Sequence, residues 1–400
     1  MDHCPPEIAF RICEYACMDD GTTARSLSLV STYLHDVSQP LQWRNVAVSG
    51  LKQARALLTV LDSSNHSRRK VIAHLLLSDR VEEYAVVDWY RHRAPRDEED
   101  ALRLREWNHE RAEWREVQNR ILSYAASTLK TLTALFHDPY QSSWYIQDAL
   151  NFSYPVLEEL TIRGSAWEPR FADDMTPETD HANVDLPSLR KIHLVGTGSF
   201  QRVIRQLAIR SPIISHLRLT GISRDLGFTT KLYAELHERG LAPSSLEGVK
   251  SSFRRRLQGE DSIVARDVDW PAILPAALEL LVTQPMRMPP TTECRCCSGY
   301  AATEWVTHVL REIGKAQGNA SDSSSEGESE HMHEGKGRRS TAFLYLPAAR
   351  DLYTFADAKG DWVDGLSGGE GCWEGRRDFD LDPWSEESEQ EDGTGSTGSF

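Results

Sequence analysis

The first 45 residues carry apolar side chains at helical spacing, and this spacing predicts three short helices. Pro6 fits the first turn of the first helix, Thr22 or Thr23 can cap the second, and Pro40 opens the third. The apolar positions of the three helices are Ile8, Ile12 and Ala16, then Leu27, Val30 and Leu34, then Leu41 and Trp43. A unit of this size buries only a small part of its surface, so we expect apolar side chains to remain available to a partner.

A six-residue pattern, apolar-x-x-apolar-x-apolar, recurs from residue 72 onward and resembles the strand of a leucine-rich repeat. It occurs as Ile72/Leu75/Leu77, Leu157/Leu160/Ile162, Leu189/Ile192/Leu194 and Ile214/Leu217/Leu219, with a weaker version at Leu129/Leu132. The starts at 129, 157, 189 and 214 are separated by 28, 32 and 25 residues, which suits one strand and one helix per unit. The sequence therefore predicts an α/β fold built as an irregular, repeat-like array. The alternative is that these hexads are ordinary strands of another α/β domain.

Other segments extend this array at both ends. We expect a strand at 46–48 and a helix at 51–61, then strands at 277–283 and 341–346 around a helix at 300–315. Residues 97–127 read as one long amphipathic helix, which we expect to pack back onto the array. Its apolar positions are Leu104, Trp107, Trp114, Val117, Ile121 and Tyr124.

One glycine-rich turn, Gly196 to Phe200, follows a predicted strand and precedes a helix at 200–210. A phosphate-binding turn has this placement, but Gln201 replaces the third glycine of that motif and no lysine follows. A repeat turn in which Ser199 caps the helix is the preferred interpretation.

Charge is distributed unevenly along the chain. Of the net charge of −15, residues 318–400 contribute −12, from 19 acidic and 7 basic residues. The remainder is nearly neutral and shows no basic stripe, so we do not expect a nucleic acid as partner. Residues 318–340 are serine-rich, acidic and without periodicity, so a disordered insert is expected there, and residues 378–400 are expected to form a disordered acidic tail. Ser323 and Ser325 each precede a glutamate by three residues and are possible phosphorylation sites.

The seven cysteines are scattered and odd in number, which favours a reducing compartment over a disulfide framework. The sequence shows neither a signal peptide nor an apolar run long enough for a membrane span, so we expect a cytoplasmic or nuclear protein without membrane contact. Cys294, Cys296 and Cys297 form one tight cluster, and His308, His331 and His333 are the nearest histidines in sequence. Structural zinc sites commonly use two separated ligand pairs, so a loop of reduced thiols is favoured over zinc. No cofactor is expected.

Three short sequence segments near the N-terminus also resemble those of a known protein family. The order Pro-Pro-Glu-Ile, Leu-Ser-Leu-Val-Ser and Trp-Arg-Asn-Val resembles the F-box of basidiomycete fungal proteins, although Cys4 replaces the usual leucine and the loop from Ala16 to Ala24 is longer. The segment Gly368 to Trp373 resembles their closing segment, and we expect Trp373 to plug the end of the array. The expected domains are an F-box at 1–48, an array at 49–317, the insert at 318–340, the last strand and closing segment at 341–377, and the tail at 378–400.

This resemblance implies a substrate-recruiting adaptor of a cullin-RING ubiquitin ligase of the SCF type. The F-box would bind a Skp-family linker protein, and the concave surface of the array would bind an unknown protein client. The adaptor would have no catalytic residue and would not be an enzyme. The residues that the resemblance assigns to the linker are Pro5, Pro6, Ile8, Ile12, Leu29, Val30 and Trp43, the last of which could instead be core. Two alternatives remain: an interaction scaffold whose F-box no longer binds the linker, and an enzyme with a cleft in the α/β array.

Overall fold

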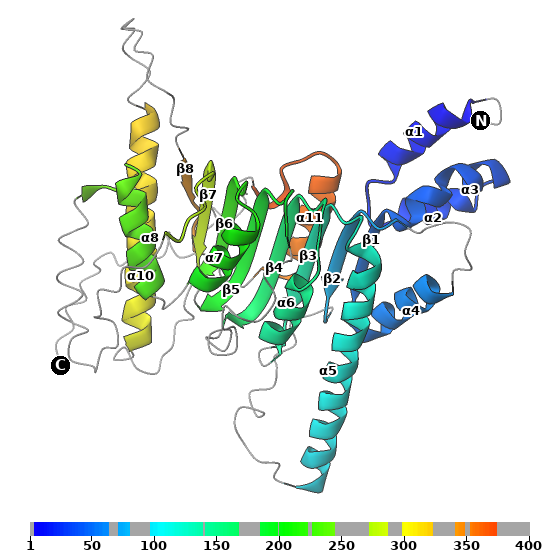
Figure 1. Ribbon diagram of the computed structural model, residues 1–400, viewed down its shortest axis with the longest axis horizontal. Coiled ribbons are helices and arrows are strands. Elements are labelled where there is room, and N and C mark those ends of the chain that lie inside the picture. Colours follow the sequence, from blue (N-terminus) through cyan, green and yellow to red (C-terminus); the bar gives the residue numbers. More distant parts are fainter. Residues whose placement is uncertain are drawn as a thin grey trace, which may run out of the picture.

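The computed structural model describes eleven stretches of the chain. They are residues 4–63, 71–80, 97–138, 141–167, 185–198, 200–222, 226–244, 272–286, 298–322, 341–348 and 353–373. The architecture is α/β: a set of short N-terminal helices leads into one large parallel sheet with helices beside it (Figure 1).

The sheet has eight strands, and their order across the sheet is their order in the chain. Every neighbouring pair is parallel. The strands are β1 (Asn45–Ser49), β2 (His74–Ser78), β3 (Thr131–Phe136), β4 (Glu159–Trp167), β5 (Lys191–Gly198), β6 (His216–Ile222), β7 (Leu280–Pro285) and β8 (Ala342–Tyr345). All strands predicted from the hexads are confirmed, as are those at both ends of the sheet.

Helices cover one face of this sheet and form the main core with it. They are α4 (Gly50–Asp62), α5 (Glu98–Ala125), α6 (Ser142–Leu150), α7 (Gln201–Arg210), α8 (Leu226–Glu238) and α10 (Ser298–Asp322). The second and third apolar residues of each hexad, such as Leu160 and Ile162, pack into this core. Because strand residues alternate between faces, Thr161 and Arg163 point to the opposite face.

The long helix α5 has the predicted length but divides into two parts. Trp114, Val117 and Ile121 in its C-terminal half are buried in the main core, which confirms the expected packing onto the sheet. The N-terminal half extends past the ends of the neighbouring helices (Figure 1). There Leu104 and Trp107 are only half-buried.

The N-terminal region has four short helical elements where three helices were predicted. They are α1 (Pro6–Ala16), α2 (Thr22–Ser28), α3 (Thr32–Ser38) and the 3-10 helix η1 (Gln39–Trp43). The predicted second helix is broken because Ser31 has an extended backbone and its side chain accepts the N–H of Leu34, which starts α3. Gly21, with φ +84°, precedes α2 in place of a threonine cap.

Two further boundaries differ from the sequence predictions. Phe200 occupies the N-cap position of α7, whereas Ser199 lies outside the described residues. Helix α10 continues to Asp322, so helix replaces the first five residues of the predicted insert. Ser323, Ser325 and the rest of the insert lie outside the described residues, as does the predicted acidic tail.

The closing segment takes a different place from the one expected. Residues 353–373, hereafter the strap, contain α11 (Phe355–Leu366) and the 3-10 helix η8 (Gly371–Trp373). The strap lies on the sheet face opposite α6 and α7 (Figure 1). Trp373 contacts β4, β5 and β6 through Glu159, Lys191 and His216. The prediction that Trp373 plugs the end of the array is therefore wrong, because the chain turns back from β8 across the sheet.

The contact of α10 with β8 allows a stability test. A Cβ at Gly314 would lie 2.6 Å from the Cβ of Tyr345. We expect Gly314→Ala to lower the free energy of unfolding by about 1–3 kcal/mol in urea denaturation, because the added methyl group overfills the contact.

The control for this substitution is Gly365→Ala in α11, where nothing lies within 4 Å of the added Cβ. Helix propensity alone should make this variant more stable by roughly 0.5–1 kcal/mol. Equal effects of the two substitutions would contradict the close approach of α10 and β8.

Candidate functional site

The N-terminal helices expose a group of large apolar side chains. On α1, Ile8 is 53% exposed, Ile12 49% and Tyr15 74%, and their spacing places them on one side of the helix. In the turn between α2 and α3, Leu29 is 87% exposed and Val30 69%. Exposed apolar side chains grouped on neighbouring elements are typical of an interaction surface. We call Ile8, Ile12, Tyr15, Leu29 and Val30 the N-terminal apolar surface.

The small core beneath this surface explains the exposure. The buried residues of α1 are Ala9 and Cys13, Phe10 is partly buried, and Cys17 follows Cys13 by one turn. Cysteine behaves as a small apolar residue, so this stripe fills the interior together with Ala24, Leu34 and Leu41. Ile8 and Ile12 lie one position earlier and therefore point outward. Burial raises the pKa of Cys17 to about 11, so its thiol stays protonated at neutral pH.

Six of the seven residues predicted to contact the linker are exposed, and one is not. Pro5 and Pro6 are exposed at the start of α1, where the Pro5 carbonyl accepts the N–H groups of Ile8 and Ala9. Trp43 is half-buried and packs against the main core. Tyr15 belongs to the same side of α1 and was missed by the sequence analysis, although it lies seven residues after Ile8.

The long loop between α1 and α2 is held by contacts to the rest of the chain. Asn45, at the start of β1, donates from Nδ2 to the carbonyls of Cys17 and Asp19 at 3.0 and 3.1 Å. The Asp20 carboxylate forms an ion pair of 2.8 Å with Lys359 of the strap. The extra loop residues thus join the N-terminal helices to β1 and to α11.

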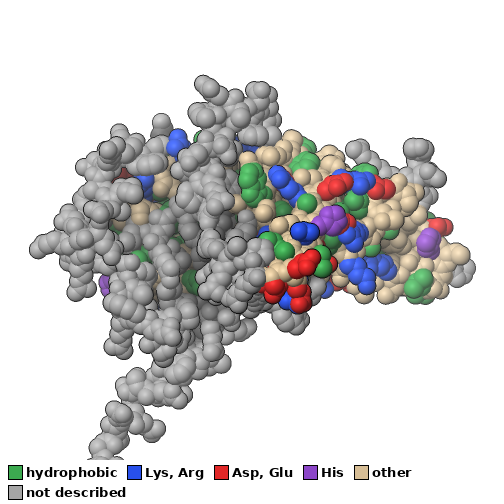
Figure 2. Space-filling view, turned by 90° about the horizontal axis from the view of Figure 1, so that it is seen from below, with side chains coloured by type: hydrophobic (Ala, Val, Ile, Leu, Met, Phe, Trp, Pro, Cys, Tyr) green, Lys and Arg blue, Asp and Glu red, His purple; other side chains and the backbone are tan. Residues whose placement is uncertain are grey.

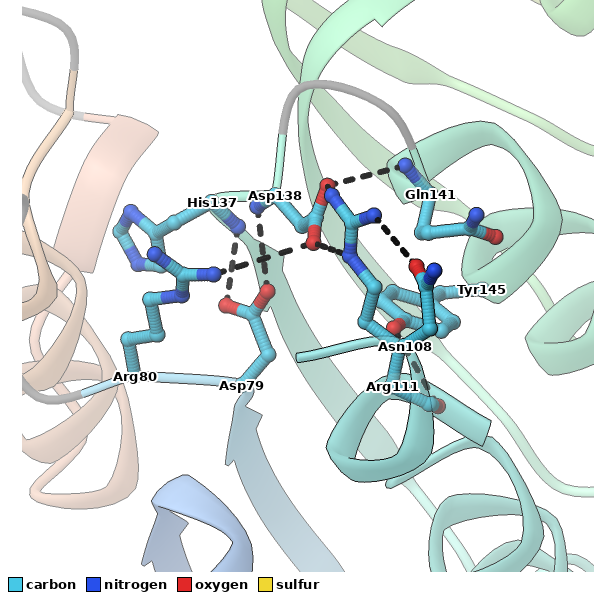
Figure 3. A network of polar contacts seen from close by, with 8 residues as sticks. All are labelled: Asp79, Arg80, Asn108, Arg111, His137, Asp138, Gln141 and Tyr145. Atoms are coloured by element: carbon cyan, nitrogen blue, oxygen red, sulfur yellow. Dashed lines mark hydrogen bonds and ion pairs between the residues drawn. The ribbon is translucent and has the colours of Figure 1, made fainter. Parts of the chain in front are cut away.

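A polar cluster, separate from the N-terminal apolar surface, lies where β2 and β3 end (Figure 3). Asp138 accepts Nε and Nη2 of Arg111, on α5, at 2.6 and 2.8 Å. It also accepts the N–H of Gln141 at 3.1 Å, and Arg80 lies 3.7 Å away. Asp79 accepts the backbone N–H groups of His137 and Asp138 at 2.9 and 3.1 Å. The cluster ties two strand ends to α5 and to the start of α6.

The chemistry of this cluster suits a structural role, in which it fixes the position of α5. Burial raises the pKa of Asp79 to about 6, although two amide donors and Arg80 favour its charged form. Burial also lowers the pKa of His137 to about 3, and Arg163 and Arg80 add to that shift. Both carboxylates are engaged by backbone amides or guanidinium groups, so the cluster positions α5.

Polar and ionisable side chains also lie on the strap face of the sheet, at strand positions that alternate with the apolar ones. They are Glu159 and Arg163 on β4, Lys191 and His193 on β5, and His216 and Arg218 on β6, and burial lowers the pKa of both histidines. Only the apolar positions of these strands were predicted from the sequence, although the alternate positions carry the charged residues Glu159, Arg163, Lys191 and Arg218.

Several predicted sites fall elsewhere. Cys294, Cys296, Cys297, His331 and His333 lie outside the described residues. Within the described stretches, no group of three or more His, Cys, Asp or Glu side chains is placed to bind a metal ion. No helix in the same stretches has both the length and the apolar character of a membrane span.

Figure 2 shows acidic and basic side chains interspersed on the described surface in view.

Comparison of the chain with protein families, with curated proteins and with solved structures finds no match in any of the three.

The cluster at the strand ends predicts a specific pH dependence. The pKa of Asp79 is about 6 in the folded chain and roughly 3.9 when unfolded, so the folded state binds more protons between these values. The free energy of unfolding therefore falls as pH rises from 4 to 6 on account of this group, and stays reduced above pH 6. His137 acts in the opposite direction, because its pKa is lowered by folding.

Asp79→Asn isolates the effect of the carboxyl group. We expect the stability of the wild type relative to this variant to fall by about 1–2 kcal/mol between pH 4 and pH 7, measured by urea denaturation at each pH. A difference between the two proteins that does not change with pH would show that Asp79 does not titrate in this range.

Proposed function

We propose that this protein is an F-box-type adaptor of a cullin-RING ubiquitin ligase, which binds a Skp-family linker through its N-terminal helices and a protein client through the sheet domain. The resemblance of the N-terminal sequence segments to the F-box indicates the class of partner protein. In this proposal ubiquitin transfer belongs to other subunits, so the adaptor needs no catalytic residue or cofactor. Its place is the cytoplasm or the nucleus, and neither a membrane nor a nucleic acid is a partner.

The observation that supports the proposal best is the exposure of the N-terminal apolar surface. Ile8, Ile12, Leu29 and Val30 were assigned to linker binding from the sequence, and all four side chains are solvent-exposed. At roughly 25 cal/mol per Å² of apolar surface, covering four such side chains supplies several kcal/mol for binding. Trp43 has a supporting role in this proposal, since it packs against the main core.

The placement of the long loop also supports the proposal. Its hydrogen bonds are donated by Asn45 to carbonyls that include that of Asp19, and its ion pair involves Lys359. None of these three residues belongs to the N-terminal apolar surface. The insertion therefore has its own contacts and uses none of the side chains assigned to the linker.

Co-purification with a Skp-family linker tests the proposal. Wild-type protein should retain the linker, whereas Ile8→Asp combined with Val30→Asp should reduce capture at least tenfold, because two carboxylates would be desolvated at the interface. Both sites are exposed, so the fold of the variant should remain intact in circular dichroism.

Ile209→Asp provides a matched control for this experiment. Ile209 is an exposed isoleucine on α7, with 72% of its surface accessible, and lies outside the N-terminal apolar surface. Capture by this variant should equal that of the wild type. Failure of the wild type to capture the linker would contradict the ligase proposal and favour a scaffold that acts without a ligase.

A further inference from the structure

The strap is held on the sheet through backbone carbonyls, one indole ring and a small apolar cluster, in which Tyr353 and Ala358 pack with Leu135 and Val195 of the sheet. Arg163 on β4 donates from Nη1 to the Tyr353 carbonyl at 2.7 Å, and Arg218 on β6 donates to the Cys372 carbonyl. Tyr353 also packs edge-on against His193 on β5, with ring centroids 4.8 Å apart. The two arginines thus each bind a backbone carbonyl near one end of the strap.

The indole of Trp373 occupies a polar cage at the start of the same strands. Its Nε1 donates to the Glu159 carboxylate at 3.0 Å. The ring of His216 packs edge-on at 5.6 Å, and Nζ of Lys191 lies 5.7 Å from the indole centroid. Each of three neighbouring strands supplies one wall, so the cage selects a flat aromatic group that carries an N–H donor.

The face beneath the strap is chemically suited to an acidic ligand. Arg163 and Arg218 are only 3% and 6% exposed. Besides Cys372, Arg218 donates to Gln284 Oε1 at 3.2 Å and to Thr220 Oγ1 at 3.3 Å, and all three acceptors are neutral. A guanidinium group bonds a carboxylate more strongly than a neutral oxygen, so this position favours a negatively charged partner.

The net charges of the strap and of the face are opposite in sign, although the carboxylates of Asp357, Asp361 and Asp364 accept hydrogen bonds from the strap itself. The strap contains Asp357, Asp361, Asp364 and Glu370 and only one basic residue, Lys359, for a net charge of −3. The face contributes Arg163, Lys191 and Arg218 against Glu159, a net charge of +2. The segment seen on the face is thus an acidic peptide with a tryptophan near its end.

We propose that the strap face is a binding groove for an acidic, tryptophan-containing peptide segment of a partner protein, and that the strap fills this groove in the same chain. The inference rests on the proposed function in identifying the partner as the client of the adaptor. The strap is suited to displacement because its described residues form a helix and a 3-10 turn and add no strand to the sheet. Opening it leaves every ladder of the sheet intact.

Binding of a synthetic peptide with the sequence of residues 353–373 tests the groove. The receptor is the full-length chain carrying Gly371→Ala and Trp373→Ala. A Cβ at residue 371, where φ is +56°, would lie 2.8 Å from the carbonyl oxygen of Asp361 and so loosen the end of the strap. By fluorescence anisotropy, the labelled peptide should bind this receptor at least tenfold more tightly than the wild type.

Two controls define the chemistry of binding. Adding Arg218→Gln to the loosened receptor should weaken binding of the peptide at least tenfold, and a scrambled peptide of the same composition should not bind. Equal binding to wild type and loosened receptor, or binding that is indifferent to Arg218→Gln, would overturn the proposal. The assay contains no linker protein, so its failure leaves linker binding untouched, and failure of linker capture leaves the groove untouched.

Hydrogen exchange on the wild-type chain gives a second test that needs no substitution. Amides of α11 and η8 should exchange at least tenfold faster than those of β5 and β6, because the strap opens without unfolding of the sheet. Strap amides that exchange as slowly as the sheet would show that the two open only together, and would overturn the proposal.

Discussion

The parallel pairing of eight strands in chain order is the constraint on which the rest of the structure depends. Each strand is in register with the next, so that Leu132, Leu160, Ile192 and Leu217 form one row across the sheet. Because side chains alternate along a strand, this register also aligns the intervening residues on the opposite face. One sheet therefore has an apolar face, which builds the core with the helices, and a face whose chemistry is free to vary.

That second face shows how buried charge is accommodated. Arg163 and Arg218 come from strands separated by β5, so they stand apart and each finds its own acceptors. Burying a guanidinium group is costly unless its donors are satisfied, and the strap supplies carbonyl oxygens at both positions. Removing the strap would expose these groups to water, which can satisfy them again, and would also expose Leu135 and Val195, which pack against it. In the proposed open state the guanidinium groups are thus solvated and not left without acceptors.

The sequence predicted the strands well because the hexads report the register directly. The sequence predicted the structure less well where a side-chain cap or contacts distant in sequence determine it. The second N-terminal helix breaks at Ser31 because a side-chain cap outweighs a continuous apolar spacing. The position of Trp373 on the middle strands was not predicted, because its partners Glu159, Lys191 and His216 are more than 150 residues away in sequence. Ile8 and Ile12 are exposed, in keeping with the expectation that so small a unit leaves some apolar side chains available.

The proposed linker and client surfaces are connected by an ion pair between Asp20 and Lys359. The side chain of Lys359 is 40% exposed and that of Asp20 is 25% exposed. Ion pairs with this access to solvent contribute about 0–1 kcal/mol, which corresponds to at most roughly a fivefold change in an equilibrium. Displacing the strap therefore costs the N-terminal helices little. In the proposed adaptor the two surfaces are therefore occupied independently, with the linker on exposed apolar side chains and the client in competition with the strap.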